Sequence, residues 1–281
     1  LLVHFTVPAL VDVAVRVAES KGIPIVLMYH SDVTGPSVAA RIAGWCYDQL
    51  IGRTTIHRIK HLLVASDLYL SQSRLLGFYD GAVSFAPPGV SLSFDSLPVE
   101  DSRNDAPYFL FVGKPANSGK GFQVLLNAWR NVYKETGVQL FIAGDIPSSA
   151  SYIKEPGCKA RGYIDNDRIL ASYYQHAQAT VLPSVSGESF GMVLAESLVC
   201  GTPVIGTKIG GVSAVVEDGF NGYSVAPNSI NELITALYKT LDNQVTLRQF
   251  IAKSDYRKRF SWDNTAETIA HAVHQSLVAR P

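Results

Sequence analysis

Two glutamates separated by seven residues form the most informative chemical pattern in the chain. Glu188 and Glu196 belong to the segment PSVSGESFGMVLAE at residues 183–196. We expect Glu188 on a loop after a strand and Glu196 in the second turn of a helix that begins near Gly191. The N-terminus of that helix has free N–H groups and a dipole that favours an anion. The eight-residue step from Glu188 to Glu196 runs partly through a loop and partly through a helix, and it separates the two carboxylates by very roughly 10 Å. This spacing suits a nucleotide sugar, with its diphosphate between the two acids.

A second loop also has the composition of an anion site. Residues 111–121 read FVGKPANSGKG, and we expect them to follow a strand and open a helix. Lys114 and Lys120 bring two positive charges to a diphosphate. Ligands of open α/β sheets bind at the carboxyl ends of strands, where both loops would lie. The loop matches neither GxxxxGK[ST] nor GxGxxG, so a P-loop ATPase and a dehydrogenase are unsupported.

These loops require a scaffold of alternating strands and helices. Short β-rich apolar runs alternate with helical patterns, which predicts an α/β fold with doubly wound parallel sheets. The predicted strands are 2–5, 24–28, 61–65, 82–86, 108–112, 139–143, 179–182 and 202–207. The predicted helices are 10–21, 38–51, 71–78, 121–135, 191–199, 230–241 and 264–277.

The alternation stops at Pro87, Pro88 and Gly89, and residues 91–107 have a linker composition rich in Ser, Asp, Asn and Pro. We therefore predict a partial first domain with linker at 1–104, a nucleotide-sugar-binding domain at 105–262, and a C-terminal helix at 263–281 that packs back toward the first domain. About 90 residues before the linker are fewer than the roughly 150 of a doubly wound domain. We expect the first domain to lack its N-terminal portion.

Composition narrows the classes of partner and compartment. Lys plus Arg and Asp plus Glu each number 24, so no nucleic-acid partner is expected. Three distant cysteines, no CxxC pair and no apolar run of about 18 residues indicate a cytoplasmic protein. The cluster Arg257, Lys258 and Arg259 is typical of a solvated helix face, and peripheral contact with anionic lipid at the inner membrane face stays open.

The motifs together resemble glycosyltransferase family 4. The resemblance rests on the EsFGMvlaE block, the Gly210–Gly211 pair with the EDGFNG segment at 217–222, and the FVGK loop, and it covers nearly the whole chain. It implies a GT-B architecture, in which two Rossmann-like domains face a cleft, and a retaining, metal-independent enzyme without a cofactor. The donor would be a UDP- or GDP-linked hexose and the acceptor a glycan or a lipid-linked molecule, as in polysaccharide biosynthesis.

The resemblance also implies residue roles. Glu188 would contact the donor sugar, Lys120 the diphosphate, and His30 the sugar from the first domain; these are the expected catalytic residues. Retention without a covalent nucleophile implies a front-face displacement. The expected substrate-binding residues are Gly113, Lys114, Gly191, Met192, Val193, Glu196 and Gly211.

Two departures from the family pattern leave an alternative open. Lys114 replaces the usual Arg, which keeps the charge but loses bidentate geometry. The family's N-terminal glycine-rich loop has no counterpart, so acceptor binding is only partly encoded. The alternative is a catalytically incompetent nucleotide-sugar-binding protein or fragment. An NAD-type module is a distant third.

Overall fold

The protein is described by a computed structural model that covers residues 1–33, 37–91 and 106–278. Its contacts divide the chain into two units. One unit holds Leu1–Gly89 and the C-terminal segment that begins at Trp262, and the other holds Val90–Ser261. The predicted linker, 91–107, lies mostly outside the described residues.

The first unit is built on a parallel sheet with the order β1-β2-β3-β4. The strands are β1 (Leu2–Phe5), β2 (Val26–Tyr29), β3 (His61–Val64) and β4 (Ala82–Phe85). The helices are α1 (Pro8–Ser20), α2 (Val38–Tyr47), α3 (Arg53–Ile56), α4 (Asp67–Gln72) and α11 (Trp262–Val278). The two central strands, β2 and β3, are fully buried, as expected of a parallel sheet covered on both faces.

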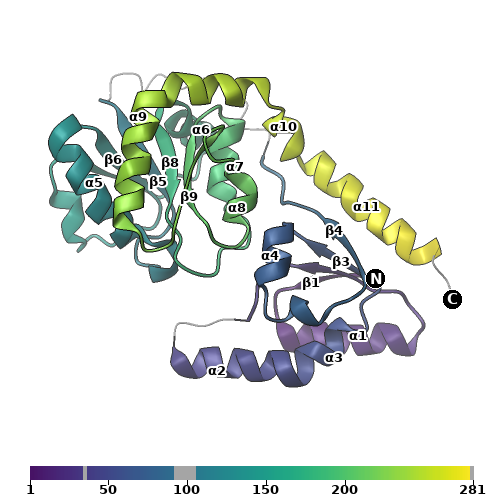
Figure 1. The fold of residues 1–281 in the computed structure, drawn as a ribbon. Coiled ribbons are helices and arrows are strands. Elements are labelled where there is room, and N and C mark those ends of the chain that lie inside the picture. Colours follow the sequence, from purple (N-terminus) through teal and green to yellow (C-terminus); the bar gives the residue numbers. More distant parts are fainter. Residues whose placement is uncertain (34–36, 92–105, 279–281) are drawn as a thin grey trace. The chain divides into compact units, whose positions relative to one another are not determined.

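Helix α11 completes this unit although it comes last in the chain (Figure 1). It packs on β2, β3 and β4. Ala272 is fully buried there, in a cluster with Val26, Met28, Leu63 and Ala86. The C-terminal helix therefore supplies part of the core for a sheet formed by the first 90 residues.

The second unit has a six-stranded parallel sheet with the order β10-β9-β8-β5-β6-β7. The strands are β5 (Tyr108–Val112), β6 (Gln139–Ala143), β7 (Cys158–Gly162), β8 (Ala179–Leu182), β9 (Val204–Thr207) and β10 (Gly222–Val225). The helices are α5 (Phe122–Thr136), α6 (Asp167–His176), α7 (Met192–Val199), α8 (Val212–Val215), α9 (Ile230–Lys253) and α10 (Tyr256–Arg259).

Two pairs of helices cover opposite faces of this sheet. Phe109, Phe111 and Ile142 point to the face that α5 and α9 cover. Side chains alternate along a strand, so Tyr108 and Thr180 point the other way and bond to α6 and α7. Because helices pack on both faces of the sheet, the carboxyl ends of its parallel strands lie side by side along one edge.

The chain reverses its direction across the sheet at β5. It runs from β5 outward through β6 to β7, then returns to β8 on the other side of β5 and continues to β9 and β10. The loops after β5 and β8 therefore diverge from neighbouring strand ends, which is the position where open α/β sheets bind ligands.

Several predicted elements need correction. The predicted helix 71–78 is wrong: α4 ends at Gln72, and only Leu76–Phe78 forms a further short 3₁₀ turn. Ser73 between them is extended, and its hydroxyl donates to Asp32 at 2.5 Å. The helix predicted at 38–51 continues through a π-helical segment, Asp48–Gly52, into α3.

Several elements of the second unit were not predicted. Strand β7 lies at the sheet edge and has mostly exposed or half-buried residues, so it lacks an apolar signal. Strand β10, at the other edge, follows the turn predicted around residues 217–219 and was not predicted as a strand. Helix α6 escaped prediction, and helix α9 extends twelve residues beyond the predicted end, to Lys253.

Candidate functional site

The loops after β5 and β8 are in direct contact. The backbone N–H of Val185 donates to the carbonyl of Gly119 at 2.8 Å. Gly121 has φ +64° and begins α5, and a Cβ there would lie 1.9 Å from the carbonyl oxygen of Pro183. Only glycine fits both the left-handed backbone and this approach. The packing fixes Lys120, the preceding residue, beside the β8 loop.

Lys120 and Glu188 form an ion pair. The ammonium Nζ lies 2.6 Å from Oε2 of Glu188, and the two side chains are 33% and 13% exposed. The hydroxyl of the buried Ser184 donates to the same oxygen at 3.0 Å. Two of the three predicted catalytic residues are thus brought together from loops 68 positions apart in the chain. Ser184 was not predicted.

Gly191 begins α7 with φ +89°, a left-handed conformation. A Cβ at this position would lie 3.3 and 3.4 Å from the side chains of Leu182 and Val212. The backbone angle requires glycine. The next two residues, Met192 and Val193, are half-buried in the first turn, where backbone N–H groups lack acceptors within the helix.

Gly211 supports the Glu188 loop from the other side. Its N–H donates to the carbonyl of Glu188 at 3.0 Å, and a Cβ there would lie 1.9 Å from the carbonyl oxygen of Ser189. Gly211 therefore packs directly against the loop that carries the acid.

Glu196 faces a buried tyrosine. Its Oε2 accepts a hydrogen bond from the hydroxyl of Tyr174 at 2.6 Å. Burial raises the pKa of Glu196, and the bond from Tyr174 opposes that rise. Sequence reasoning missed Tyr174 because it missed α6, although Asn166 caps the start of this helix and apolar residues recur along it at helical spacing.

Lys114 is placed differently from Lys120. It follows Gly113, which has φ +147°, and its side chain is 70% exposed. Its Nζ lies 3.4 Å from the carboxylate of Asp145, which follows β6. An exposed pair at this distance contributes little to stability.

His30 lies in the first unit, directly after β2. Its Nε2 is 2.9 Å from Nδ1 of His4, and the two rings stack with centroids 5.2 Å apart. Burial lowers the pKa of His30, and His4 lowers it further. The sequence analysis did not predict the partnership with His4.

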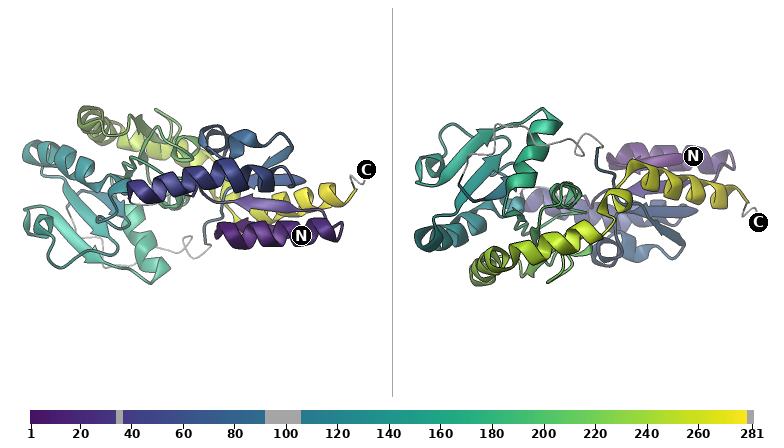
Figure 2. Two further views of the ribbon diagram at one scale, coloured as in Figure 1. Left: turned by 90° about the horizontal axis from the view of Figure 1, so that it is seen from below. Right: turned by 90° about the horizontal axis from the view of Figure 1, so that it is seen from above.

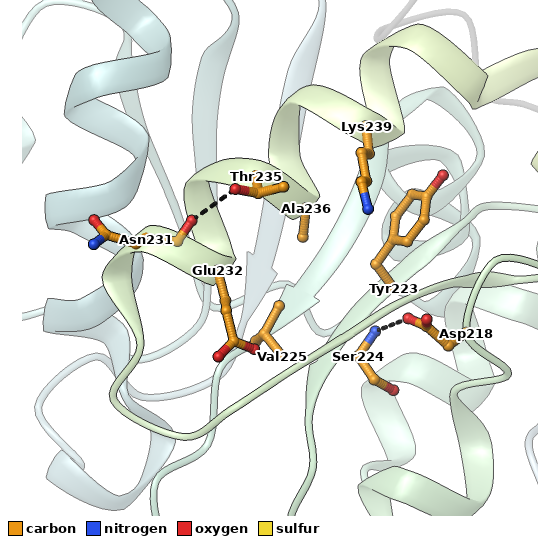
Figure 3. Close-up of a pocket in the computed structure, with 9 residues that line it drawn as sticks. All are labelled: Asp218, Tyr223, Ser224, Val225, Asn231, Glu232, Thr235, Ala236 and Lys239. Atoms are coloured by element: carbon orange, nitrogen blue, oxygen red, sulfur yellow. Dashed lines mark hydrogen bonds between the residues drawn. The ribbon is translucent and has the colours of Figure 1, made fainter.

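A separate pocket of about 290 Å³ opens between the edge strand β10 and helix α9 (Figure 3). Lys239 and Tyr223 lie near each other on one side of it, and Asp218 accepts from the N–H of Ser224 at 2.7 Å. None of the predicted site residues lines this pocket.

Sequence comparison places the chain among known proteins. The family model for glycosyl transferases group 1 matches residues 106–243. A phosphatidyl-myo-inositol mannosyltransferase of Mycobacterium leprae is 30% identical over 278 residues, which cover 93% of this chain and 69% of that protein. The chain belongs to the group 1 glycosyl transferases.

Other relatives of this family member are named for a different activity. D-inositol 3-phosphate glycosyltransferases of Nocardiopsis dassonvillei and Catenulispora acidiphila are 28% and 31% identical and match 88% and 86% of the chain. The chain spans 64% and 60% of their lengths.

Solved structures confirm the fold of this family member as GT-B, with two Rossmann-like units. Sucrose-phosphate synthase from Thermosynechococcus elongatus has a TM-score of 0.77 at 24% identity, over 99% of this chain and 74% of that one. Anabaena HepE in complex with UDP has a TM-score of 0.77 at 17% identity, over 98% and 78%. Among the helices described here, none is long and apolar enough to cross a membrane.

Proposed function

We propose that this group 1 glycosyl transferase binds a nucleotide-diphosphate sugar at the β5 and β8 loops and transfers its hexose, with retention, to a glycan or lipid-linked acceptor. The observation that carries the proposal is the Lys120–Glu188 pair at the reversal point of the sheet, next to the N-terminus of α7. A cation and a helix N-terminus suit a diphosphate, and a carboxylate suits sugar hydroxyls.

The ion pair leaves binding capacity on both partners. An ammonium group has three N–H donors, and Lys120 uses one of them on Glu188. Both contacts of Glu188 are to Oε2. None of the residues that the structure describes bonds to Oε1, so this oxygen can accept from sugar hydroxyls. Lys120 can therefore bind a phosphate oxygen while it still holds Glu188 in place.

The proposed reaction breaks the bond between the anomeric carbon and the diphosphate and forms a bond to the acceptor oxygen on the same face. The acceptor proton passes to the departing phosphate oxygen. Lys120, Lys114 and the N–H groups of Gly191, Met192 and Val193 stabilise the charge that develops on the leaving group, and this electrostatic term is the main contribution of the protein. No metal is required in this scheme.

The remaining roles belong to the same proposal. Glu196 would bind the ribose, Gly113 and Gly211 would allow the backbone to approach the donor, and His30 would contact the sugar. UDP and GDP are the candidate nucleotides. HepE, solved with UDP and with UDP-glucose, supports the first of them as a fold relative. We place the activity in the cytoplasm, with peripheral contact at the inner membrane face as a further part of the proposal.

The test is a radiolabelled-donor assay with candidate acceptors. Lys120→Ala and Glu188→Ala should each lower transfer by at least about 100-fold, because each removes charge stabilisation or sugar positioning. Lys134→Ala, which removes an exposed lysine of α5, is the control and should match the wild type. Full activity of either site variant would refute the assignment. Nucleotide binding without turnover would instead favour the non-catalytic binding protein.

A further inference from the structure

Tyr174 is a buried residue held firmly in place. It lies near the end of α6, on the same face of the sheet as α7. The hydroxyl of Thr202 donates to its carbonyl oxygen at 2.6 Å. The guanidinium of Arg248 donates to the carbonyls of Gln175 and Ala177, which lie one and three positions after Tyr174 in the sequence. The end of α6 is therefore fixed by bonds from two other segments.

The tyrosine in turn fixes one oxygen of Glu196. Its hydroxyl donates to Oε2 at 2.6 Å, while Oε1 has no hydrogen-bond partner among the residues that the structure describes. An ionised carboxylate accepts about four hydrogen bonds. The contact with Tyr174 uses one of these and restricts rotation of the group, which leaves Oε1 to accept from a ligand.

We infer that Tyr174 is a positioning residue that makes the site selective for ribonucleotides, by holding Glu196 so that its free oxygen accepts from the ribose hydroxyls. The inference rests on the proposed function, which assigns the ribose to Glu196. A ribose presents two neighbouring hydroxyls, and a carboxylate fixed before binding loses less conformational entropy when it accepts from them. A site built around a hydroxyl also rejects the analogue that lacks it.

Protonation supports this geometry. Burial and the neighbouring Glu196 raise the pKa of Tyr174 well above its usual range, so its hydroxyl remains a donor at working pH. Burial and the charge of Asp167 raise the pKa of Glu196, and the bond from Tyr174 lowers it. Loss of that bond should therefore raise the pKa of Glu196 further and reduce the ionised fraction in mildly acidic buffer.

The test is isothermal titration calorimetry of the full chain with UDP, GDP and their 2′-deoxy analogues. The wild type should bind the better ribonucleotide at least about tenfold more tightly than its deoxy analogue. Tyr174→Phe should weaken ribonucleotide binding by about tenfold and leave deoxynucleotide binding nearly unchanged, so that the ratio falls to within about threefold.

A matched control is available in the other unit. The hydroxyl of Tyr47 donates to Oδ1 of the buried Asp12 at 3.0 Å. Tyr47→Phe thus removes a tyrosine–carboxylate hydrogen bond without touching Glu196 or α6, and its selectivity ratio should equal that of the wild type. A thermal melt of each variant reports whether the two substitutions destabilise the fold equally.

The pH profile provides a second readout. In the wild type, selectivity should fall as the pH drops and Glu196 becomes protonated, a measurement that needs no variant; a ratio independent of pH would overturn the inference. In Tyr174→Phe this loss should begin at higher pH. An unchanged ratio in Tyr174→Phe, with lowered thermal stability alone, would show that Tyr174 is merely structural. A wild type that binds none of these nucleotides would refute the proposed function itself.

Discussion

At the residue scale, Arg130 and Glu155 form a two-point ion pair between α5 and the segment before β7. Nε of Arg130 donates to Oε2 at 2.8 Å, and the second guanidinium nitrogen donates to Oε1 at 2.5 Å. Arg130 lowers the pKa of Glu155 below its ordinary value of 4.5. The folded state therefore binds this proton less tightly than the unfolded state does.

The lowered pKa of Glu155 makes the free energy of unfolding depend on pH. The stabilisation is complete above the unfolded pKa and is lost as the pH falls through the lower folded pKa. Because the arginine is 42% exposed, solvent screening limits the effect to about 0.5–1 kcal/mol. We expect Glu155→Gln to lower the free energy of unfolding by that amount at pH 7 and to have almost no effect near pH 2. Urea unfolding at both pH values measures it, and equal losses would contradict the ion-pair explanation.

The cysteines also differ at this scale. Cys46 is half-buried, whereas Cys158 and Cys200 are buried. Burial raises the pKa of the Cys158 thiol to about 11. Since the thiolate is the reactive form, we expect a thiol reagent at pH 8 to modify Cys46 first. Mass spectrometry of the partly labelled protein identifies the site. Preferential labelling of Cys158 would show that the α5 and β7 packing opens in solution.

At the scale of elements, the start of α5 holds the β5 loop against the β8 loop. Gly121→Ala should lower the free energy of unfolding by more than about 3 kcal/mol, because it adds a steric contact with Pro183 to the cost of a left-handed alanine. It should also weaken nucleotide binding, since Lys120 would be displaced. Chemical unfolding and calorimetry measure the two effects.

Gly137 is the matched control at the other end of the same helix. It has φ +70°, and nothing lies within 4 Å of a Cβ built there. Gly137→Ala should cost only the left-handed conformation, about 1–2 kcal/mol, and leave nucleotide binding unchanged. Equal losses for the two variants would refute the steric role of Gly121.

At the scale of the whole molecule, the chain returns to its first unit through α11. Ala272 is fully buried against β2 and β3, so Ala272→Glu would place a charge in an apolar cluster. We expect a loss of at least about 3 kcal/mol in the first unit. Nucleotide binding, which we assign to the second unit, should persist at low temperature. Thermal unfolding with and without UDP measures the stability of the first unit and nucleotide binding separately. Loss of UDP binding together with the first unit would contradict the assignment of the nucleotide site to the second unit alone.

The local signals of the sequence predicted the central elements well. Strands 108–112, 139–143 and 179–182 lie inside the six-stranded sheet and have the predicted bounds, because each is a mostly apolar run. The edge strand 2–5 also has the predicted bounds. The edge strands β7 and β10 were not predicted, because several of their side chains are exposed or half-buried and need not be apolar. Helix 71–78 was wrong because Ser73 takes part in hydrogen bonding with Asp32, a contact that periodicity does not encode.

The sequence by itself determined the α/β class, the family and most of the candidate residues, because these depend on local periodicity and on motifs of neighbouring residues. Only the tertiary structure decided the order of the strands, and with it the contact of Lys120 with Glu188 and of Tyr174 with Glu196. Both contacts join residues more than 20 positions apart, so they depend on which strands become neighbours. That choice follows from packing of the whole unit, which no local pattern of residues records.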